Sequence, residues 1–291
     1  MKRYRTISGT IFDIFNYTFL FLLMLLMAFP LVYVVAGSFT SDAELAVSRI
    51  VFIPRQPTLE SYRYILTSGV ILTSFGNSVL ITLVGTVINI FLTALTAYPL
   101  SRDSLLGRKF FMGLIVFTML FSGGMIPNYL LVKSLRLLNT YWSLWLPGAI
   151  SAYNLVLLRS FFMSLPGELI DASRIDGCSE PQILSRIVLP LSLPSLSAIG
   201  MFYLVGHWNA YFNALMYIDD MYQWPLQVWL RQIVILSQTG FDPNAAPGSF
   251  VMPPETSKLA VVCIAVVPIL CIYPFLRKNF TKGVMIGSVK G

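Results

Sequence analysis

The sequence predicts an all-α integral membrane protein in which six helices cross the bilayer. The first observation is composition: of 291 residues, 56% are hydrophobic and only 11% are charged. A soluble domain carries about 25% charged residues, so a soluble globule is excluded. The second observation is the length of the stretches without any charged residue, and the third is the uneven distribution of charge between the loops.

Six stretches of the chain contain no Asp, Glu, Lys or Arg, and they are 18 to 38 residues long. A transmembrane helix needs about 20 apolar residues, so each stretch is long enough, the last one narrowly. No internal repeat or soluble domain interrupts them, and we expect residues 1–291 to form a single membrane domain. The predicted spans are 12–37, 72–100, 109–131, 142–163, 187–217 and 258–277.

The first span follows Lys2, Arg3 and Arg5 and could be mistaken for a signal peptide. Its apolar run is about twice the usual length of a signal-peptide core, and no A-x-A cleavage pattern follows it. We expect it to be retained. The two long segments between spans on the opposite side, 38–71 and 218–257, contain prolines and aromatic residues. We expect short surface helices in both, at positions that the sequence does not define.

The basic residues are concentrated on one side of this topology. Six spans place both termini on the same side, and that side carries 13 of the 20 basic residues but six of the 13 acidic ones. Because loops rich in Lys and Arg stay in the cytoplasm, both termini are predicted to be cytoplasmic. The formal charge of +7 is thus explained by topology, and no nucleic-acid partner is expected.

Polar side chains occur inside two of the spans. The second span contains two asparagines, and the fifth contains "GHWNAYFNALMY" with the only histidine of the chain. Polar groups at membrane depth often line a path or a pocket, and aromatic rings with amides suit sugars. Helix packing and an interfacial aromatic belt are the alternatives, and both stay open. The candidate path residues are Asn77, Asn89, His207, Trp208, Asn209, Tyr211 and Asn213.

No Asp, Glu, Lys or Arg falls in the core of any predicted span. Carriers driven by protons or sodium usually need buried ionisable groups to bind the coupling ion. The sequence also has no recognisable metal-ligand set, catalytic triad or phosphate-binding loop. We therefore expect no enzymatic activity in this chain and an external source of energy. An ion-coupled secondary carrier and an intramembrane enzyme or scaffold are the rival interpretations.

The loop between the fourth and fifth spans, residues 164–190, contains the charged passage "ELIDASRIDGCSEPQILSRIVLP". Glu168 to Asp176 is predicted to form about two helical turns, and Gly177 is a natural helix stop. Ser179 to Gln182 resembles a capping box that begins a second helix. The first helix is expected to present Ala172 and Ser173 on one side. Its charges are mixed, which favours a docking element over a helix lying on lipid headgroups.

This loop resembles the E-A-A-x3-G-x9-I-x-L-P loop of permease subunits of bacterial ATP-binding-cassette importers. Two positions depart mildly from the pattern, with Asp171 in place of the usual Glu and Ser173 in place of the usual Ala. The stretches "GGMIPNYLLVKSLRLLNTYWSLWLP", "GHWNAYFNALMYIDD" and "GVMIGSVKG" resemble the carbohydrate branch of that family, the MalG-like subunits. The matching loop residues are Asp171, Ala172, Ser173, Gly177, Ile187, Leu189 and Pro190.

The resemblance implies a type I importer fold in the bacterial cytoplasmic membrane, with loop 164–190 as the coupling helix that docks into an ATPase. It implies four kinds of partner: a homologous second permease, a dimer of cytoplasmic ATPase subunits, an extracellular or periplasmic solute-binding protein, and an oligosaccharide or polysaccharide fragment as substrate. ATP and Mg would bind the ATPase subunits, and this chain would hold no cofactor and no metal. The C-terminal residues implied to contact the ATPases are Gly287, Ser288, Val289, Lys290 and Gly291.

Overall fold

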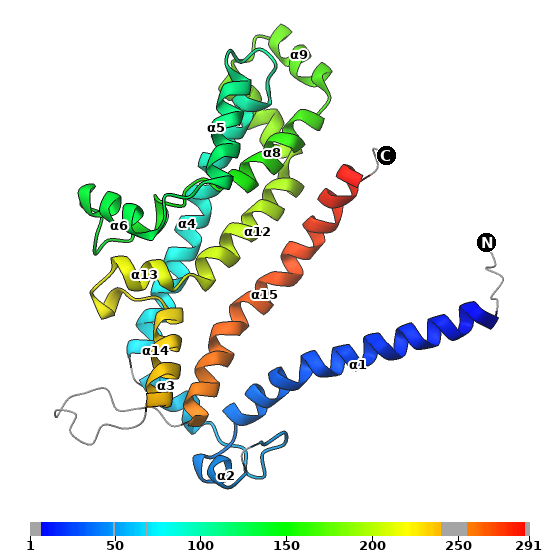
Figure 1. The fold of residues 1–291 in the computed structure, drawn as a ribbon. Helices are drawn as coiled ribbons and strands as arrows, with labels where there is room; N and C mark the ends of the chain where they lie inside the picture. Colours follow the sequence, from blue (N-terminus) through cyan, green and yellow to red (C-terminus); the bar gives the residue numbers. More distant parts are fainter. Residues whose placement is uncertain (1–6, 49, 68, 240–254, 289–291) are drawn as a thin grey trace. The chain divides into compact units, whose positions relative to one another are not determined.

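The computed structural model describes residues 7–48, 50–67, 69–239 and 255–288, and every regular element in those ranges is a helix (Figure 1). The predicted all-α fold is confirmed. The chain divides into two compact units, one of Met1–Gly69 with Gln232–Val266 and the other of Val70–Arg231 with Val267–Gly291. Whether they act as a single membrane domain stays a prediction.

In the first unit, a hydrogen-bonded group at the start of the last helix joins segments distant in sequence. Asp42 Oδ1 accepts hydrogen bonds from the Thr256 hydroxyl at 2.7 Å and from the Thr256 N–H at 3.3 Å. The Ser61 hydroxyl donates to Thr256 Oγ1 at 2.8 Å. Because the first N–H groups of a helix lack partners within it, Asp42 stabilises this helix start. The group joins α2 (Asp42–Val47), α3 (Glu60–Thr67) and the first turns of α15 (Glu255–Ser288), and α1 (Ile7–Ser38) also belongs to this unit.

The second unit is built around α4 (Val70–Ser101), which packs along α8 (Ala152–Ser164) and α12 (Leu193–Asn209) (Figure 1). Small residues of α4 such as Ala97 allow close approach, and Phe162 of α8 is fully buried there. The remaining elements of this unit are α5 (Arg108–Leu120), α6 (Met125–Ser134), α7 (Trp142–Trp145), α9 (Gly167–Ile175), α10 (Glu180–Ile183), η1 (Leu184–Val188), α11 (Leu189–Leu191), α13 (Phe212–Tyr217), η2 (Met221–Gln223) and the first turns of α14 (Leu226–Thr239).

Three predicted spans correspond to single long helices: 12–37 to α1, 72–100 to α4 and 258–277 to α15. Within the described residues, two helices are long and apolar enough to cross a membrane, Gly9–Ser38 and Val70–Ser101. Two bent helix pairs raise that number to four if each pair is one span. The count of six spans stays a prediction.

Residues 109–131, predicted as one span, do not form one continuous helix. The chain forms α5 and α6 instead, and the chain direction bends by 117° between them. Gly124 precedes α6 with φ of +86°, a conformation that glycine adopts without steric cost, and Pro127 lies in the first turn of α6. The glycine turn and the proline at a helix start interrupt an uncharged run whose composition looks uniform.

The predicted spans 142–163 and 187–217 are also interrupted. In the first, α7 is a single turn, Pro147 and Gly148 follow it, and Ser151 begins α8 by accepting a hydrogen bond from the Asn154 N–H. In the second, Glu180–Leu191 and α12 are bent by 83°, and α12 has Pro194 in its first turn. Proline removes a helical N–H and clashes with the preceding turn, so each break has a local cause that hydropathy does not report.

The expectation of short helices in the two long segments is met where the structure describes them. Segment 38–71 contains α2 and α3, and segment 218–257 contains η2 and α14. The amphipathic α3 buries Ser61 and Ile65 while its remaining faces are more exposed. Residues 240–254 lie outside the described part of the chain.

Candidate functional site

The predicted coupling loop, residues 164–190, has the expected arrangement of helix, turn and helix. α9 ends at Ile175, and Gly177 follows with φ of +80°. Ser179 begins α10, and its N–H donates to Gln182 Oε1 at 2.8 Å, as in a capping box. The local signals read from the sequence are confirmed at each of these positions.

One face of this loop is anchored in the core of the second unit. Ile170 and Ile183 are buried in the same hydrophobic core cluster as Leu158 of α8. Ser173 is buried on the same face, and its hydroxyl donates to the Leu169 carbonyl at 2.5 Å. The expectation that Ala172 and Ser173 share a presented side is therefore wrong.

Helix geometry explains this correction. Residues three apart lie on one face of a helix, so Ser173 follows Ile170 inwards. The outward surface of the loop carries Asp171, Ala172 and Gly177. Towards α12, the side chains of Ile187 and Leu189 are partly buried, whereas Pro190 is exposed.

A charged cluster joins this loop to α4. The Tyr98 hydroxyl donates to Glu180 Oε2 at 2.5 Å, and Arg174 donates to Glu180 Oε1 from Nη2 at 2.8 Å and from Nε at 3.1 Å. The Arg102 guanidinium lies over the Tyr98 ring, 4.6 Å from its centroid. Arg174 also donates to Asp171 Oδ1 at 3.3 Å. We call Tyr98, Arg102, Asp171, Arg174 and Glu180 the charged cluster.

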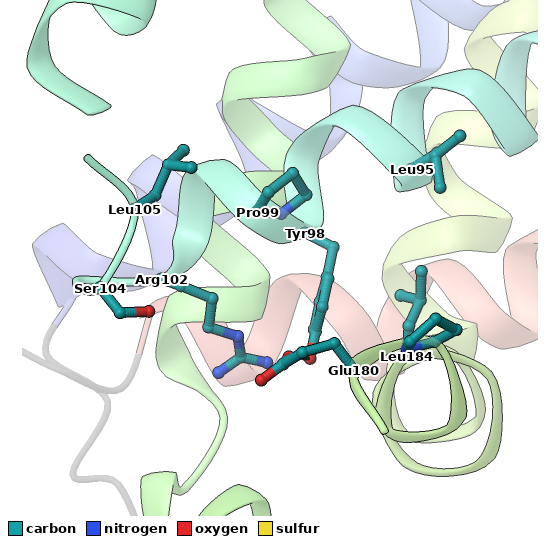
Figure 2. Close-up of a pocket in the computed structure, with 9 residues that line it drawn as sticks. Leu95, Tyr98, Pro99, Arg102, Ser104, Leu105, Glu180 and Leu184 are labelled. Carbon is teal, nitrogen blue, oxygen red and sulfur yellow. Dashed lines mark hydrogen bonds between the residues drawn. The ribbon is translucent and has the colours of Figure 1, made fainter. Parts of the chain in front are cut away.

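The bonds to Glu180 stabilise its ionised form. The Tyr98 hydroxyl, followed by the Arg174 guanidinium, holds the pKa of the Glu180 carboxyl below its usual range. The bond to Glu180 likewise raises the pKa of Arg174. Figure 2 shows Tyr98 of α4 and Arg102, which directly follows α4, extending towards Glu180 in the wall of an open pocket of about 430 Å³. Leu95, Pro99 and Leu184 supply apolar walls to this pocket.

Sequence reasoning missed Tyr98 and Arg102. The available signal was their spacing of four residues near the end of a predicted span, because residues with this spacing share a face where a helix continues. Nothing local indicated that Glu180 would be the partner, because it lies 82 residues away from Tyr98.

A second polar site lies within the unit, in a cavity of about 330 Å³ between α4, the α7–α8 segment and α12. Asn89 is 2% exposed; its Nδ2 donates to the Gly148 carbonyl at 3.1 Å. Asn89 Oδ1 lies 3.3 Å from His207 Nε2, within hydrogen-bond distance. Gly85 makes room for the imidazole, because a Cβ there would lie 2.6 Å from His207 Nε2. The polar groups of this midspan cavity are neutral amides, hydroxyls and an imidazole.

Tyr203 is a cavity residue that the sequence did not single out. Its hydroxyl lies 2.8 Å from Thr93 Oγ1 and accepts a hydrogen bond from the Ser151 N–H at 2.9 Å. Asn154 also lines the cavity. The spacing of Ser151 and Asn154 is that of a helix N-cap and could have indicated this helix start.

The seven predicted path residues do not form one group. Asn89, His207 and Asn213 line the midspan cavity. Asn77 instead donates to the backbone carbonyls of Tyr222 at 2.7 Å and Trp224 at 3.3 Å, and so holds a loop. The other three have different surroundings: Trp208 is buried with its ring 6.0 Å from that of Phe75, Asn209 is exposed, and the Tyr211 ring lies 4.5 Å from the Arg231 guanidinium.

The predicted C-terminal contact residues are only partly described. Gly287 and Ser288 form the last residues of α15. Val289, Lys290 and Gly291 lie outside the described residues. The role of these five residues stays a prediction.

The fold agrees with the comparison to known protein families. The model of the binding-protein-dependent transport system inner membrane component family matches residues 93–285. The chain belongs to this family of non-catalytic, multi-pass transport permeases of the inner membrane.

Individual proteins with known names or structures are also similar to this chain. The chain is 46% identical to the polygalacturonan/rhamnogalacturonan transport system permease protein YtcP of Bacillus subtilis, over 98% of this chain and 100% of the relative. It is also 46% identical to protein LplC of the same organism, over 99% and 98%. A solved chain of a bacterial ABC transporter that imports the acidic polysaccharide alginate superposes with a TM-score of 0.88 at 29% identity, over 96% of this chain and 100% of that one.

Proposed function

We propose that this chain is one of two homologous permease subunits in an ATP-driven, binding-protein-dependent importer of oligosaccharides or polysaccharide fragments. It would form half of the translocation path, with six spans and both termini in the cytoplasm. The observation that carries the proposal is the coupling loop, which is anchored by Ile170 and Ile183 and presents Asp171, Ala172 and Gly177 outwards. A docking element needs this combination of a firm base and an exposed outer face.

The proposed machine has its energy source in partner subunits. Two cytoplasmic ATPase subunits would bind ATP and Mg, and an extracellular or periplasmic solute-binding protein would deliver the sugar. Closure of the ATPase dimer would move the docked loops, and packed helices would carry that motion to the path. In this proposal the chain itself binds no cofactor and catalyses no reaction.

Two of the similar proteins support a narrower substrate class, and the midspan cavity suits it. Polygalacturonan and alginate are both polymers of sugar acids, so we propose acidic polysaccharide fragments as substrates. Asn89, Tyr203 and His207 offer neutral donors and acceptors to hydroxyl groups. The rival, an ion-coupled carrier, is disfavoured by the family and by the absence of acidic and basic residues from the predicted span cores.

The test is uptake by the reconstituted complex. The two permeases and the ATPase pair are placed in proteoliposomes with the solute-binding protein and oligogalacturonides. We expect uptake that requires ATP on the side of the membrane where the ATPase subunits lie. Uptake should stop when a non-hydrolysable ATP analogue replaces ATP. Uptake by this chain alone, driven by a proton or sodium gradient, would overturn the proposal.

A further inference from the structure

The coupling loop is bonded to α4 through a side-chain contact as well as through apolar packing. The hydrogen bond between the Tyr98 hydroxyl and Glu180 Oε2 is short, at 2.5 Å, and its acceptor is a carboxylate. Hydrogen bonds to charged groups are stronger than neutral ones. Glu180 is itself the first residue of α10, and Arg174 of α9 bonds to its other oxygen. One carboxylate therefore connects both helices of the loop to α4.

The end of α4 is held on a second side by α8. Arg159 Nε donates to the Leu100 carbonyl at 2.8 Å, which supplies a partner to one of the last carbonyls of α4. Tyr98, which makes the first attachment, lies two residues before Leu100 and is 6% exposed. A displacement of α10 would thus act on a helix end that has little freedom to adjust independently.

α4 also reaches the midspan cavity. Asn89 and Tyr98 are nine residues apart on one continuous helix, which corresponds to about 14 Å along its axis. A helix transmits an axial shift over this distance because its backbone hydrogen bonds are internally satisfied. The Asn89 contacts to Gly148 and His207 would respond to such a shift.

We propose that the Tyr98–Glu180 hydrogen bond is the link through which the coupling loop moves α4 and the midspan cavity. This inference rests on the proposed function, because it assumes that an ATPase moves the loop. Tyr98 and Glu180 are positioning residues: neither needs to touch sugar or ATP. Arg102 supports the ring of Tyr98 by stacking, and its buried Nε and Nη2 have no hydrogen-bond acceptor among the described residues.

The decisive variant is Tyr98→Phe in the full transporter complex. It removes the hydroxyl donor and keeps the ring that packs against Phe162 and Arg102. We expect normal complex yield and normal retention of the ATPase, with the ATP hydrolysed per sugar imported rising about tenfold or more, the equilibrium equivalent of one net hydrogen bond to a charged group. Tyr153→Phe, at an exposed tyrosine of α8, is the matched control and should leave the ratio unchanged.

Variants of Glu180 separate a coupling role from a structural one. Glu180→Gln retains an oxygen that can accept from Tyr98, so its ratio should be closer to that of the wild type than the ratio of Glu180→Ala. A normal ratio in Tyr98→Phe would overturn the inference. So would a fall in complex yield that lowers ATP hydrolysis and uptake in parallel. If the wild-type complex shows no ATP-dependent uptake, the proposed function itself fails, which is a separate result.

Discussion

Two polar regions of the second unit share α4 but differ in chemistry. The midspan cavity holds neutral groups, and its Asn89 is almost completely buried. The charged cluster lies at the end of the same helix, and the side chains of Arg174 and Glu180 are 42% and 50% exposed. In the apolar part of a span, an unpaired polar group is costly and a charged group is more so. At the end of the helix, water can solvate both kinds of group.

The two regions also differ in how firmly their contacts hold the helices together. Losing one partner from a buried hydrogen bond costs about 1–3 kcal/mol, whereas a solvent-exposed ion pair contributes about 0–1 kcal/mol. The midspan contacts should therefore hold the helices firmly together. The ion pair between Arg174 and Glu180 can form and break at low cost, which suits the proposed movement of this loop against its own subunit.

The largest effect should come from overfilling the midspan cavity. In Gly85→Val, the new side chain would collide with the His207 ring, because even a Cβ at Gly85 would lie 2.6 Å from it. Overpacking of this kind costs about 1–3 kcal/mol, and we expect a loss of stability at the upper end of that range. The measurement is the thermal unfolding midpoint in detergent, which should fall. Gly76→Val is the control on the same helix, where a Cβ would meet nothing within 4 Å. Equal stability of the two variants would contradict the close packing of α4 and α12.

A smaller effect, mainly on coupling, is expected at the turn of the loop. Gly177 has φ of +80°, so Gly177→Val should add about 1–3 kcal/mol of local strain. The variant should insert normally but retain its ATPase poorly on co-purification, or hydrolyse ATP without moving sugar. Gly167→Val adds the same bulk to the loop without a positive φ. If both variants lose the ATPase equally, contact bulk is responsible and backbone strain is not.

Two asparagines near the end of α12 should differ in their effect on sugar uptake. Asn213 lines the midspan cavity, whereas Asn209 is exposed and is not among the cavity residues. Asn213→Ala should lower sugar uptake several-fold and change the free energy of unfolding by less than about 0.5 kcal/mol, the usual range for surface changes. Asn209→Ala should transport normally. The reverse order of effects on uptake would place the path outside this cavity.

The smallest effect concerns pH. The Glu180 pKa is lowered, so the stabilisation from its ionised form is complete above its ordinary pKa near 4.5 and is lost as the pH falls through the lower folded value. Between about pH 6 and 8, the Glu180 carboxyl is ionised in both the folded and the unfolded chain. The ATP-to-sugar ratio of Glu180→Gln, divided by that of the wild type, should therefore stay constant over this range. A change of that relative ratio across this window would show that another titrating group controls the link.

Local features of the chain could be predicted from residues close in sequence. The Gly177 turn and the Ser179–Gln182 capping contact depend on neighbours within three residues, so the same atoms meet whatever the rest of the fold does. The long apolar helices α1 and α4 follow from runs without charge, because a bilayer imposes their length.

Other features were decided by packing alone. The Tyr98–Glu180 and Asn89–His207 contacts join residues 82 and 118 positions apart, and no periodicity reports such pairs. Breaks within uncharged runs were missed because hydropathy averages over the turn at Gly124, whose φ is a property of the folded chain. The sequence alone determined the membrane environment, the long helices and the local turns, since these depend on composition and near neighbours. The tertiary structure decided which polar groups meet on α4, because long-range contacts depend on how the helices pack.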